Sequence, residues 1–137
     1  VTTIGLRAFE DCRSLENVYY EGTIEDWCNI TFDNFSSNPM YRAKHFYMLN
    51  SNNEYEKVTS IEIPNTVTSI GNFQFYGFVD VTSIYIPSSV TWIGEYAFYE
   101  CTSLTIYCEA KNSNITNKWS SDWNRSYCKV VWNYKNN

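Results

Sequence analysis

Residues 58–71 read VTSIEIPNTVTSIG, and residues 81–94 read VTSIYIPSSVTWIG. The two stretches are offset by 81 − 58 = 23 residues, and 12 of the 23 aligned positions (58–80 against 81–103) are identical. Identity at this level indicates an internal repeat, and a period in this range is typical of a solenoid. A solenoid is a scaffold that binds along its surface, so the repeat favours a binding protein over an enzyme.

The chain begins with a third, incomplete copy of the repeat. Residues 1–12 match residues 90–101 at the positions of Val, Thr, Ile, Gly, Ala, Phe and Cys. Because residue 1 falls in the middle of a repeat, we expect the chain to be a fragment of a longer repeat protein. Such a start leaves one coil edge uncovered near Ile4, Phe9 and Leu15, and we expect this edge to self-associate with a second copy.

Each full repeat carries the pattern of a short strand followed by a second wall. Ile61 and Ile63 alternate with polar residues, as do Ile84 and Ile86, which is the period-2 pattern of a half-buried strand. Proline follows each strand and ends it, because proline removes a ladder donor. We expect four further apolar residues to form the opposite wall of the coil: Val67, Ile70, Val90 and Ile93.

Three residue types recur after this wall. Glycine stands at positions 5, 71 and 94, where we expect a corner with positive φ. Phenylalanine stands at positions 9, 75 and 98 and should fill the coil interior. Cys12 and Cys101 share the next position, and Phe78 replaces them in the middle repeat, so we expect an apolar interior site there.

The full pattern, V-T-S-I-x-I-P-x-x-V-T-x-I-G-x-x-A-F-x-x-C, is best seen from Val81 to Cys101. It resembles the BspA-type, or Treponema-type, leucine-rich repeat, and the resemblance covers residues 1–19 and 58–108. The resemblance implies a leucine-rich-repeat fold and a secreted or cell-surface protein acting in adhesion. Gln74 departs from it, since the family has Ala there, and we expect the change to alter packing without breaking the pattern.

The predicted fold is a β-rich α/β, leucine-rich-repeat solenoid of short strands with turn or short-helix corners. We predict a single domain over residues 1–137, with one insertion and a C-terminal cap. Its parts are a partial repeat (1–19), the insertion (20–57), two full repeats (58–80 and 81–103) and the cap (104–137). In the insertion we expect a short helix with Thr23 as its N-cap and Asp26 three residues on. In the cap we expect Trp119, Trp123 and Trp132 to cover the open end of the coil.

Composition excludes several classes of partner. The net charge is −5, which argues against nucleic acid and anionic membrane surfaces. The chain holds no run of about 18 apolar residues, so we expect no membrane insertion.

The sequence holds little that could carry chemistry. His45 is the one histidine, and although Cys28 shares its segment, no family signature surrounds either residue. We therefore expect no catalytic site. The five cysteines form no C-x-x-C pair, and there is no Gly-rich phosphate loop, so we expect no metal and no cofactor. A disulfide between Cys108 and Cys128 stays an open alternative to free thiols.

What remains is the strand face, where leucine-rich-repeat proteins commonly bind. The candidate ligand-binding residues are Tyr19, Glu62, Ser83, Tyr85 and Trp92. Exposed tyrosine is favoured in binding sites, and Trp92 replaces Ser69 on the opposite wall, where it either packs under a loop or forms an exposed aromatic contact. A simpler interpretation of the face is that Thr and Ser are good exposed strand residues.

Three functions stay open at this point. The first is a non-catalytic adhesion or binding module that takes an extracellular protein ligand on the strand face. The second is a carbohydrate-binding module that stacks a glycan on exposed Trp and Tyr. The third is a passive structural spacer within a larger protein.

Overall fold

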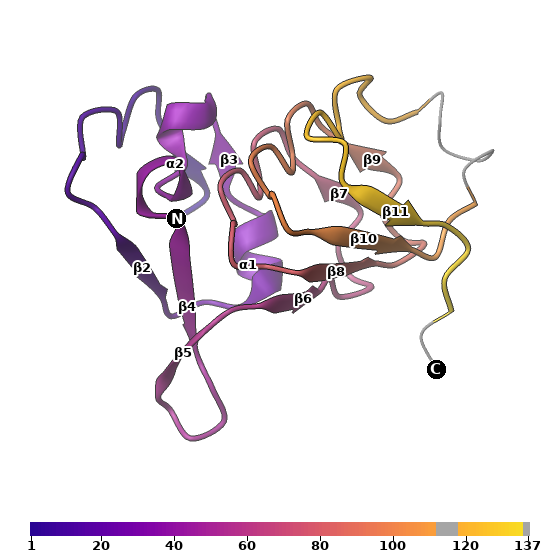
Figure 1. Cartoon of the computed structure of the whole chain (residues 1–137), viewed down its shortest axis with the longest axis horizontal. Coiled ribbons are helices and arrows are strands. Elements are labelled where there is room, and N and C mark those ends of the chain that lie inside the picture. The colour runs from indigo at the N-terminus through magenta and orange to yellow at the C-terminus, as the bar shows by residue number, and fades with distance from the viewer. Residues whose placement is uncertain (112–117, 136–137) are drawn as a thin grey trace.

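The computed structural model describes residues 1–111 and 118–135, which form short strands, short helices and turns (Figure 1). The largest sheet among the described residues has four parallel strands: β6 (Ser60–Glu62), β8 (Ser83–Ile86), β10 (Thr105–Cys108) and β11 (Lys129–Val131). Their order is β11-β10-β8-β6, and Ile84 pairs with Ile61 on one side and with Ile106 on the other. Equivalent strands of consecutive repeats therefore lie side by side.

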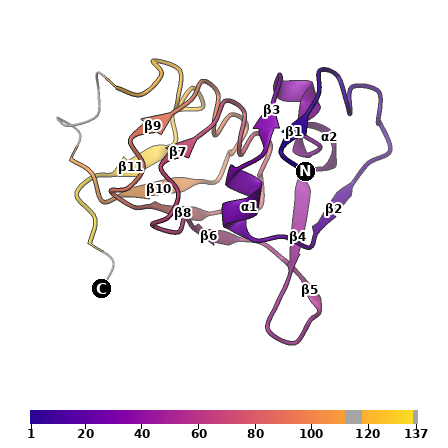
Figure 2. The ribbon, with the colours of Figure 1, turned by 180° about the vertical axis from the view of Figure 1, so that it is seen from behind.

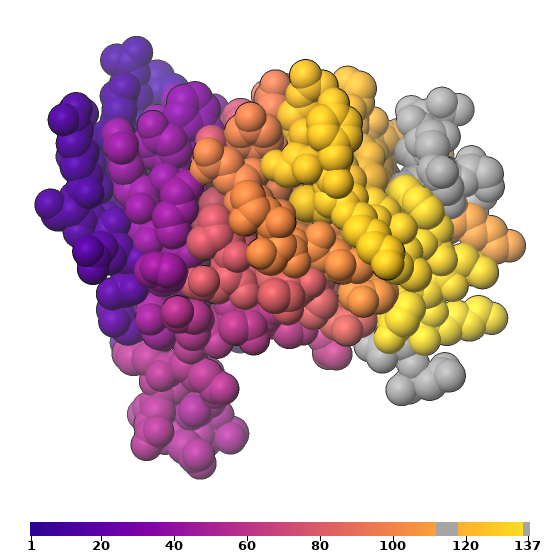
Figure 3. Space-filling view, viewed as in Figure 1, coloured from indigo at the N-terminus to yellow at the C-terminus, as the bar shows by residue number. Residues whose placement is uncertain are grey.

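A second sheet lies toward the N-terminus. β2 (Asn17–Tyr20) pairs in parallel with β4 (His45–Leu49), and β4 pairs antiparallel with β5 (Tyr55–Lys57). The turn between β4 and β5 contains the Asn-rich residues 50–53, and the hairpin projects from the body of the molecule (Figure 3). After the hairpin, the Val58 amide donates a hydrogen bond of 2.9 Å to the carbonyl oxygen of Phe46. This bond holds the chain beside β4 just before β6 begins.

The opposite wall is made of two further parallel pairs, seen from behind in Figure 2. β1 (Thr3–Ile4) pairs with β3 (Thr31–Phe32), and β7 (Ser69–Ile70) pairs with β9 (Trp92–Ile93). The four residues predicted for this wall, at positions 67, 70, 90 and 93, are all buried. The chain thus alternates between a front strand and a wall strand, which is the arrangement that the apolar pattern predicts.

The segment 20–57 also contributes to both ladders. It holds α1 (Ile24–Cys28), β3, the 3-10 helix η1 (Phe35–Ser37), α2 (Met40–Ala43) and β4. The partners of β3 and β4 are β1 and β2, which precede them by 31 − 3 = 28 and 45 − 17 = 28 residues. The excursion that leaves the parallel ladders is the shorter β4–β5 hairpin. The division of the chain at residues 19, 57, 80 and 103 stays a prediction.

The N-cap of α1 is confirmed, and the capping box is complete. The side-chain oxygen of Thr23 accepts from the Asp26 amide at 3.1 Å, and the Asp26 carboxylate accepts from the Thr23 amide at 3.0 Å. These hydrogen bonds to Thr23 lower the pKa of Asp26. A helix this short depends on such caps, because most of its backbone groups have no partner within the helix.

The core consists largely of the apolar residues that recur at the same repeat positions. Ile61, Ile84, Phe75 and Phe98 are each no more than 2% exposed, and the rings of Phe75 and Phe98 stack at 5.9 Å between centroids. Each such side chain stabilises the fold by about 1.5–3 kcal/mol on burial. Phe9 occupies the same repeat position but is only partly buried, because β1 and β2, the strands before and after it, each pair on one side only among the described strands. The interior expected for all three phenylalanines is therefore complete only at positions 75 and 98.

The recurrent glycine does not mark the positive-φ corner, so that prediction is wrong. The left-handed residues lie two positions further along, at Arg7, Phe73 and Tyr96. A different constraint acts at Gly94, where an added Cβ would lie 2.6 Å from the amide nitrogen of Asn72 and would also meet its side-chain oxygen. Glycine is thus needed at position 94 because the backbone of the preceding course approaches it closely. A course here is a stretch of chain that forms one strand of the front sheets and one strand of the opposite wall.

The two cysteines at the shared repeat position also differ in burial. Cys101 is 1% exposed, as expected for an interior site, whereas Cys12 is exposed, so the expectation of burial is wrong for Cys12. All five cysteines are free thiols, and the alternative of a Cys108–Cys128 disulfide is not realised. The Cys128 thiol instead lies 3.4 Å from the carbonyl oxygen of Cys101.

Gln74 is the centre of a buried polar network that joins the early and later courses. Its side-chain amide donates to the carbonyl oxygens of Trp27 at 2.7 Å and Ile30 at 3.1 Å, at the end of α1. The Trp27 indole N–H returns a bond of 2.9 Å to the carbonyl oxygen of Gln74. Asn38, fully buried, donates to the Phe73 carbonyl oxygen at 2.9 Å. The departure from the repeat at position 74 therefore caps a helix that the other repeats lack.

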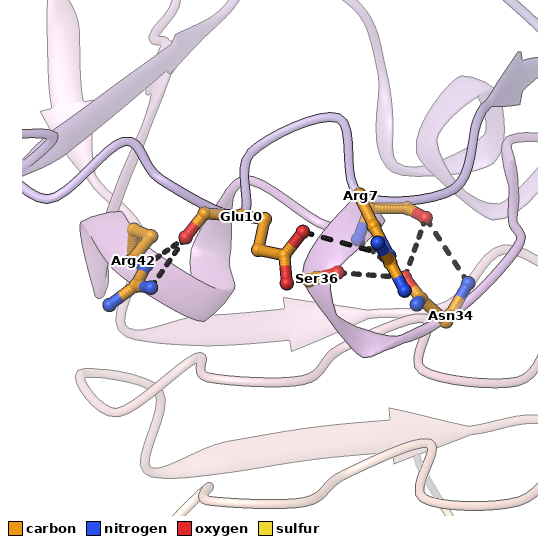
Figure 4. A network of polar contacts seen from close by, with 6 residues as sticks. Arg7, Glu10, Asn34, Ser36 and Arg42 are labelled. Atoms are coloured by element: carbon orange, nitrogen blue, oxygen red, sulfur yellow. Dashed lines mark hydrogen bonds and ion pairs between the residues drawn. The ribbon is translucent and has the colours of Figure 1, made fainter.

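A network of polar contacts joins residues 7–10 to residues 34–42 (Figure 4). The Phe9 amide donates to the Ser36 carbonyl oxygen at 3.1 Å, and Arg42 Nε donates to the Glu10 carbonyl oxygen at 3.0 Å. Arg7 and Glu10 form an exposed ion pair at 3.7 Å, which contributes little on its own. The apolar side chains of this course that pack on the core, such as Ile4, Leu15 and Val18, are only partly buried, so its apolar burial is less complete than that of the later courses.

At the other end, the tryptophans predicted to cap the coil gather in one cluster. The ring centroids of Trp119 lie 4.9 Å from those of Trp123 and 6.0 Å from those of Trp132. Trp123 also contacts Phe98 edge-on at 6.3 Å. The cluster therefore covers the last buried phenylalanine of the repeat.

Candidate binding surface

The strand face presents one side chain from each strand in a single row. The register places Glu62 of β6 beside Tyr85 of β8, Tyr85 beside Tyr107 of β10, and Tyr107 beside Val131 of β11. Alternation along each strand turns these residues outward, since their neighbours in sequence, Ile61, Ile84 and Ile106, are buried. The sequence pattern alone predicts the outward direction of Glu62 and Tyr85.

Three tyrosines form a cluster on this row. The rings of Tyr85 and Tyr107 stack with centroids 4.9 Å apart and an interplanar angle of 13°. Tyr134 lies 5.0 Å from Tyr107 and 5.5 Å from Tyr85, tilted to both. The Tyr134 amide donates to the Cys108 carbonyl oxygen at 2.8 Å, which fixes the segment after β11 against the end of β10.

A shallow cavity of about 160 Å³ opens beside these rings. It is lined by Glu62, Ile63, Tyr85, Ile86, Pro87, Tyr107, Glu109 and Tyr134. The Glu109 carboxylate accepts from the Ser88 amide at 2.9 Å, and the Glu109 amide donates to the Ile86 carbonyl oxygen at 3.0 Å. Both bonds hold Glu109 across the turn that follows β8.

Two of the five predicted site residues therefore meet here, Glu62 and Tyr85. Ser83 lies on the same strand as Tyr85, but its hydroxyl is 2.8 Å from that of Ser60, so its hydrogen bond runs along the ladder. Tyr107, Glu109 and Tyr134 were not predicted. Tyr107 carried a signal, because residues 104–108 continue the strand pattern one further period, whereas Tyr134 follows no repeat position.

Tyr19 lies on the other sheet and belongs to a second tyrosine cluster. It is 54% exposed and stacks on Tyr47 of β4 at 4.9 Å, with Tyr55 of β5 edge-on at 5.1 Å. The Tyr55 hydroxyl donates to the Glu21 carboxylate at 3.1 Å. The sequence therefore predicted one residue of this cluster, and the structure separates it from the Tyr85 row.

Trp92 lies on β9, on the wall and not on the strand face. It is 39% exposed and borders a cavity of about 260 Å³ that also involves Cys28, Phe32 and Gln74. Of the two alternatives predicted for Trp92, its exposure favours an aromatic surface contact.

The corners of the repeats form a further aromatic surface that the sequence reasoning missed. Five rings line a cavity of about 370 Å³: Phe35, Phe73, Tyr76, Tyr96 and Tyr99. Phe73 and Tyr96 are stacked at 6.1 Å, and both occupy the left-handed corner position. Burial, with the nearby Glu100 carboxylate, raises the pKa of Tyr76. The repetition of aromatic residues at an offset of 23 was the available signal.

His45 and Cys28, the two residues weighed for chemistry, lie in different surroundings. His45 Nδ1 lies 2.6 Å from the Asp80 carboxylate, which also lies 3.8 Å from the Lys57 ammonium. Burial, then the charge of Glu25, raises the pKa of the Cys28 thiol to about 12, so the nucleophilic thiolate is scarce at neutral pH. Within residues 1–111 and 118–135, no group of three or more His, Cys, Asp or Glu side chains could hold a metal ion. In the same part of the chain, no helix is long and apolar enough to cross a membrane.

Comparison with protein families gives a match over most of the chain. The BspA type leucine rich repeat region matches residues 1–56 and 49–124, in six copies. The chain therefore belongs to the BspA-type leucine-rich-repeat family, as the repeat pattern predicts, and this family is generally non-catalytic. Comparisons with curated proteins and with solved structures gave no match.

Proposed function

We propose that this chain is a non-catalytic adhesion or binding module that takes an extracellular protein ligand on its strand face. The observation that carries the proposal is the row of Glu62, Tyr85 and Tyr107, with Tyr134 beside it and an open cavity along it. Tyrosine supplies large contact area at low entropic cost and is enriched in binding hot spots. Membership of the family supports the same assignment.

The proposal includes the shape and the location of the module. The parallel pairings of the front and wall strands support a short leucine-rich-repeat solenoid, which would present the tyrosine row on a continuous strand face. Proteins of this family are typically extracellular or surface-associated, and we assign the chain a secreted or cell-surface location on that ground.

A binding assay on immobilised matrix proteins tests the proposal. Fibronectin, laminin and collagen would be presented in parallel, with a binding isotherm measured for the wild-type chain and for Tyr85→Ala/Tyr107→Ala. We expect at least one saturable interaction, weakened tenfold or more in the variant, since hot-spot truncation costs about 2 kcal/mol or more. Circular dichroism of the variant verifies its fold. Saturable binding that the variant retains in full would contradict the placement of the site.

The exposed ring of Trp92 supports a second candidate, a carbohydrate-binding module. An aromatic ring beside an open cavity can stack on a sugar ring, and stacking changes tryptophan emission. Titration with a panel of polysaccharides should then shift the fluorescence of the wild type and not of Trp92→Phe. If neither matrix proteins nor polysaccharides bind, the passive spacer is the remaining function.

Self-association through the N-terminal edge is a further proposal. Leu6 is 61% exposed, Phe9 is partly exposed, and β1 and β2 each pair on one side only among the described strands. An open strand edge with apolar neighbours is a template for pairing with another chain. Light scattering should show a dimer that Leu6→Lys dissociates, and a strict monomer at high concentration would contradict the proposal.

A further inference from the structure

We propose that the cavity beside Tyr85 binds the cationic side chain, lysine ammonium or arginine guanidinium, of a protein partner. This inference rests on the proposed function and names the chemistry that the strand face recognises. Its basis is the convergence of tyrosine rings and two carboxylates on one open cavity.

The aromatic part of the site is the outer face of Tyr85. Its inner face is covered by Tyr107, which stacks on it at 4.9 Å. The strand order β10-β8-β6 places Glu62 on the opposite side of Tyr85 from Tyr107. A cation that enters beside Glu62 therefore approaches the face of the Tyr85 ring that points away from Tyr107, the geometry in which an aromatic quadrupole attracts positive charge.

The charged part of the site comes from Glu62 and Glu109. Both line the cavity, and none of its lining residues is basic. Among the described residues Glu62 takes part in no ion pair, and Glu109 is oriented by the bond that it accepts from the Ser88 amide. Two carboxylates beside an aromatic ring can accept hydrogen bonds from an ammonium or guanidinium group while the ring contacts its charge.

The remaining lining residues select a long side chain over a small cation. Ile63, Ile86 and Pro87 form an apolar part of the cavity wall. Lysine and arginine carry aliphatic stems that pack on such surface while the charged group reaches polar partners. A quaternary ammonium cannot donate a hydrogen bond to either glutamate, which favours a basic side chain over a choline headgroup. The net charge of −5 also favours approach of a basic partner.

The second tyrosine cluster shows what the cavity adds. Tyr19, Tyr47 and Tyr55 have nearly the same ring spacing, but their neighbouring carboxylate, Glu21, already accepts from the Tyr55 hydroxyl. Glu62, by contrast, faces the cavity. The inference therefore applies to the Tyr85 cluster and not to the Tyr19 cluster.

The test is an NMR and calorimetric titration of the folded chain with hexa-arginine and hexa-lysine peptides. A glycine-serine peptide of the same length is the neutral probe, and phosphocholine is the quaternary one. The informative variants are Tyr85→Leu, which removes the ring, and Glu62→Gln/Glu109→Gln, which removes both charges but keeps acceptors. Glu16→Gln/Glu54→Gln changes the net charge equally at two exposed positions outside the cavity and is the matched control.

We expect the basic peptides to shift the amide resonances of residues 62, 85 and 107, with affinity that falls as salt rises because exposed charges are screened. Tyr85→Leu should weaken binding about two- to fivefold. Glu62→Gln/Glu109→Gln should weaken it at least as much, and the control pair should weaken it less than twofold. Equal weakening by the control pair, an absence of shifts at this row, or equal affinity for phosphocholine would each overturn the inference.

The same variants separate this inference from the proposed function. If Tyr85→Leu abolishes binding to a matrix protein while Glu62→Gln/Glu109→Gln leaves it intact, the strand face is a binding site and the cation assignment is wrong. If basic peptides bind at this row but no matrix protein depends on it, the cation site stands and the assigned class of natural ligand is wrong.

Discussion

Residues 1–12 and residues 90–101 share seven identical residues at the same repeat positions, yet these residues differ in their burial. Phe98 and Cys101 are each 1% exposed, whereas Phe9 is partly exposed and Cys12 is exposed. β10, the strand that follows the later segment, pairs on both sides, whereas β2, the strand that follows the first segment, pairs on one side only among the described strands. The burial of these two repeat positions therefore depends on the strands that lie beside each segment and not on the residue type alone.

The largest expected difference between the two segments is in the reactivity of the Cys12 and Cys101 thiols, which share one repeat position. Cys12 should be alkylated by iodoacetamide in the folded protein, while Cys101 should react at least about 10³-fold more slowly, because it is reached only through unfolding. Burial, then the nearby Cys128 thiolate, raises the pKa of Cys101 and opposes formation of the reactive species. Peptide mass spectrometry gives both rates, and in urea they should converge. Comparable rates in the folded state would refute the difference.

The phenylalanine position should show the next largest effect. Phe98→Ala removes a ring that stacks on Phe75 and contacts Trp123, and it should lower the free energy of unfolding by about 3–5 kcal/mol. Phe9→Ala, at the same repeat position, should cost about 1 kcal/mol or less, since its ring is already partly solvated. Urea denaturation measures both. Equal costs would mean that the first course is packed as tightly as the later ones.

Position 74 tests whether the repeat letter or the local network matters. Alanine is the native residue at the equivalent position 97, yet Gln74→Ala should destabilise the fold by about 2 kcal/mol. It removes the side-chain donor to the Ile30 carbonyl oxygen and one of the donors to the Trp27 carbonyl oxygen, which also accepts from the Ile30 amide. Chemical denaturation provides the measurement, with Gln74→Glu as a second variant that keeps the shape and loses the donor. A neutral Gln74→Ala would show that water replaces the amide.

The glycine position gives the smallest of these contrasts. Gly94→Ala would bring a Cβ against the Asn72 amide nitrogen, and it should cost about 1–3 kcal/mol through overpacking. At Gly5 the nearest atom to such a Cβ is an Asp33 carboxylate oxygen at 3.9 Å, so Gly5→Ala should change stability by less than about 1 kcal/mol. Thermal denaturation of the two variants checks the pair, and a larger loss for Gly5→Ala would contradict it.

Much of this fold could be predicted from the sequence, because its apolar letters repeat. The strands around Ile61 and Ile84 and the buried wall residues follow from local alternation. The glycine corner could not be predicted correctly, because the constraint at Gly94 comes from Asn72 in another course. The alternation of apolar residues along the sequence predicts the strands. The need for glycine depends on contacts between residues that are far apart in the sequence, which the alternation does not contain.

The same limit applies to the candidate site. Tyr85 and Glu62 were found because they differ within an otherwise repeated phrase. Tyr134 was not found, because it reaches the row through a backbone bond to Cys108 that no repeat position encodes. Tyr19 was grouped with Tyr85 by its repeat position, but the hairpin of β4 and β5 separates the two clusters into different sheets.

The two tyrosine clusters provide the most direct test of the central claim, which is that the row at Glu62, Tyr85 and Tyr107 is the binding surface. Tyr85→Leu and Tyr19→Leu remove equivalent rings from matched stacked pairs. Binding isotherms on the matrix protein that the wild-type chain recognises should show an affinity loss of about tenfold for Tyr85→Leu and less than about twofold for Tyr19→Leu. A loss confined to Tyr19→Leu, or equal in both variants, would contradict the account.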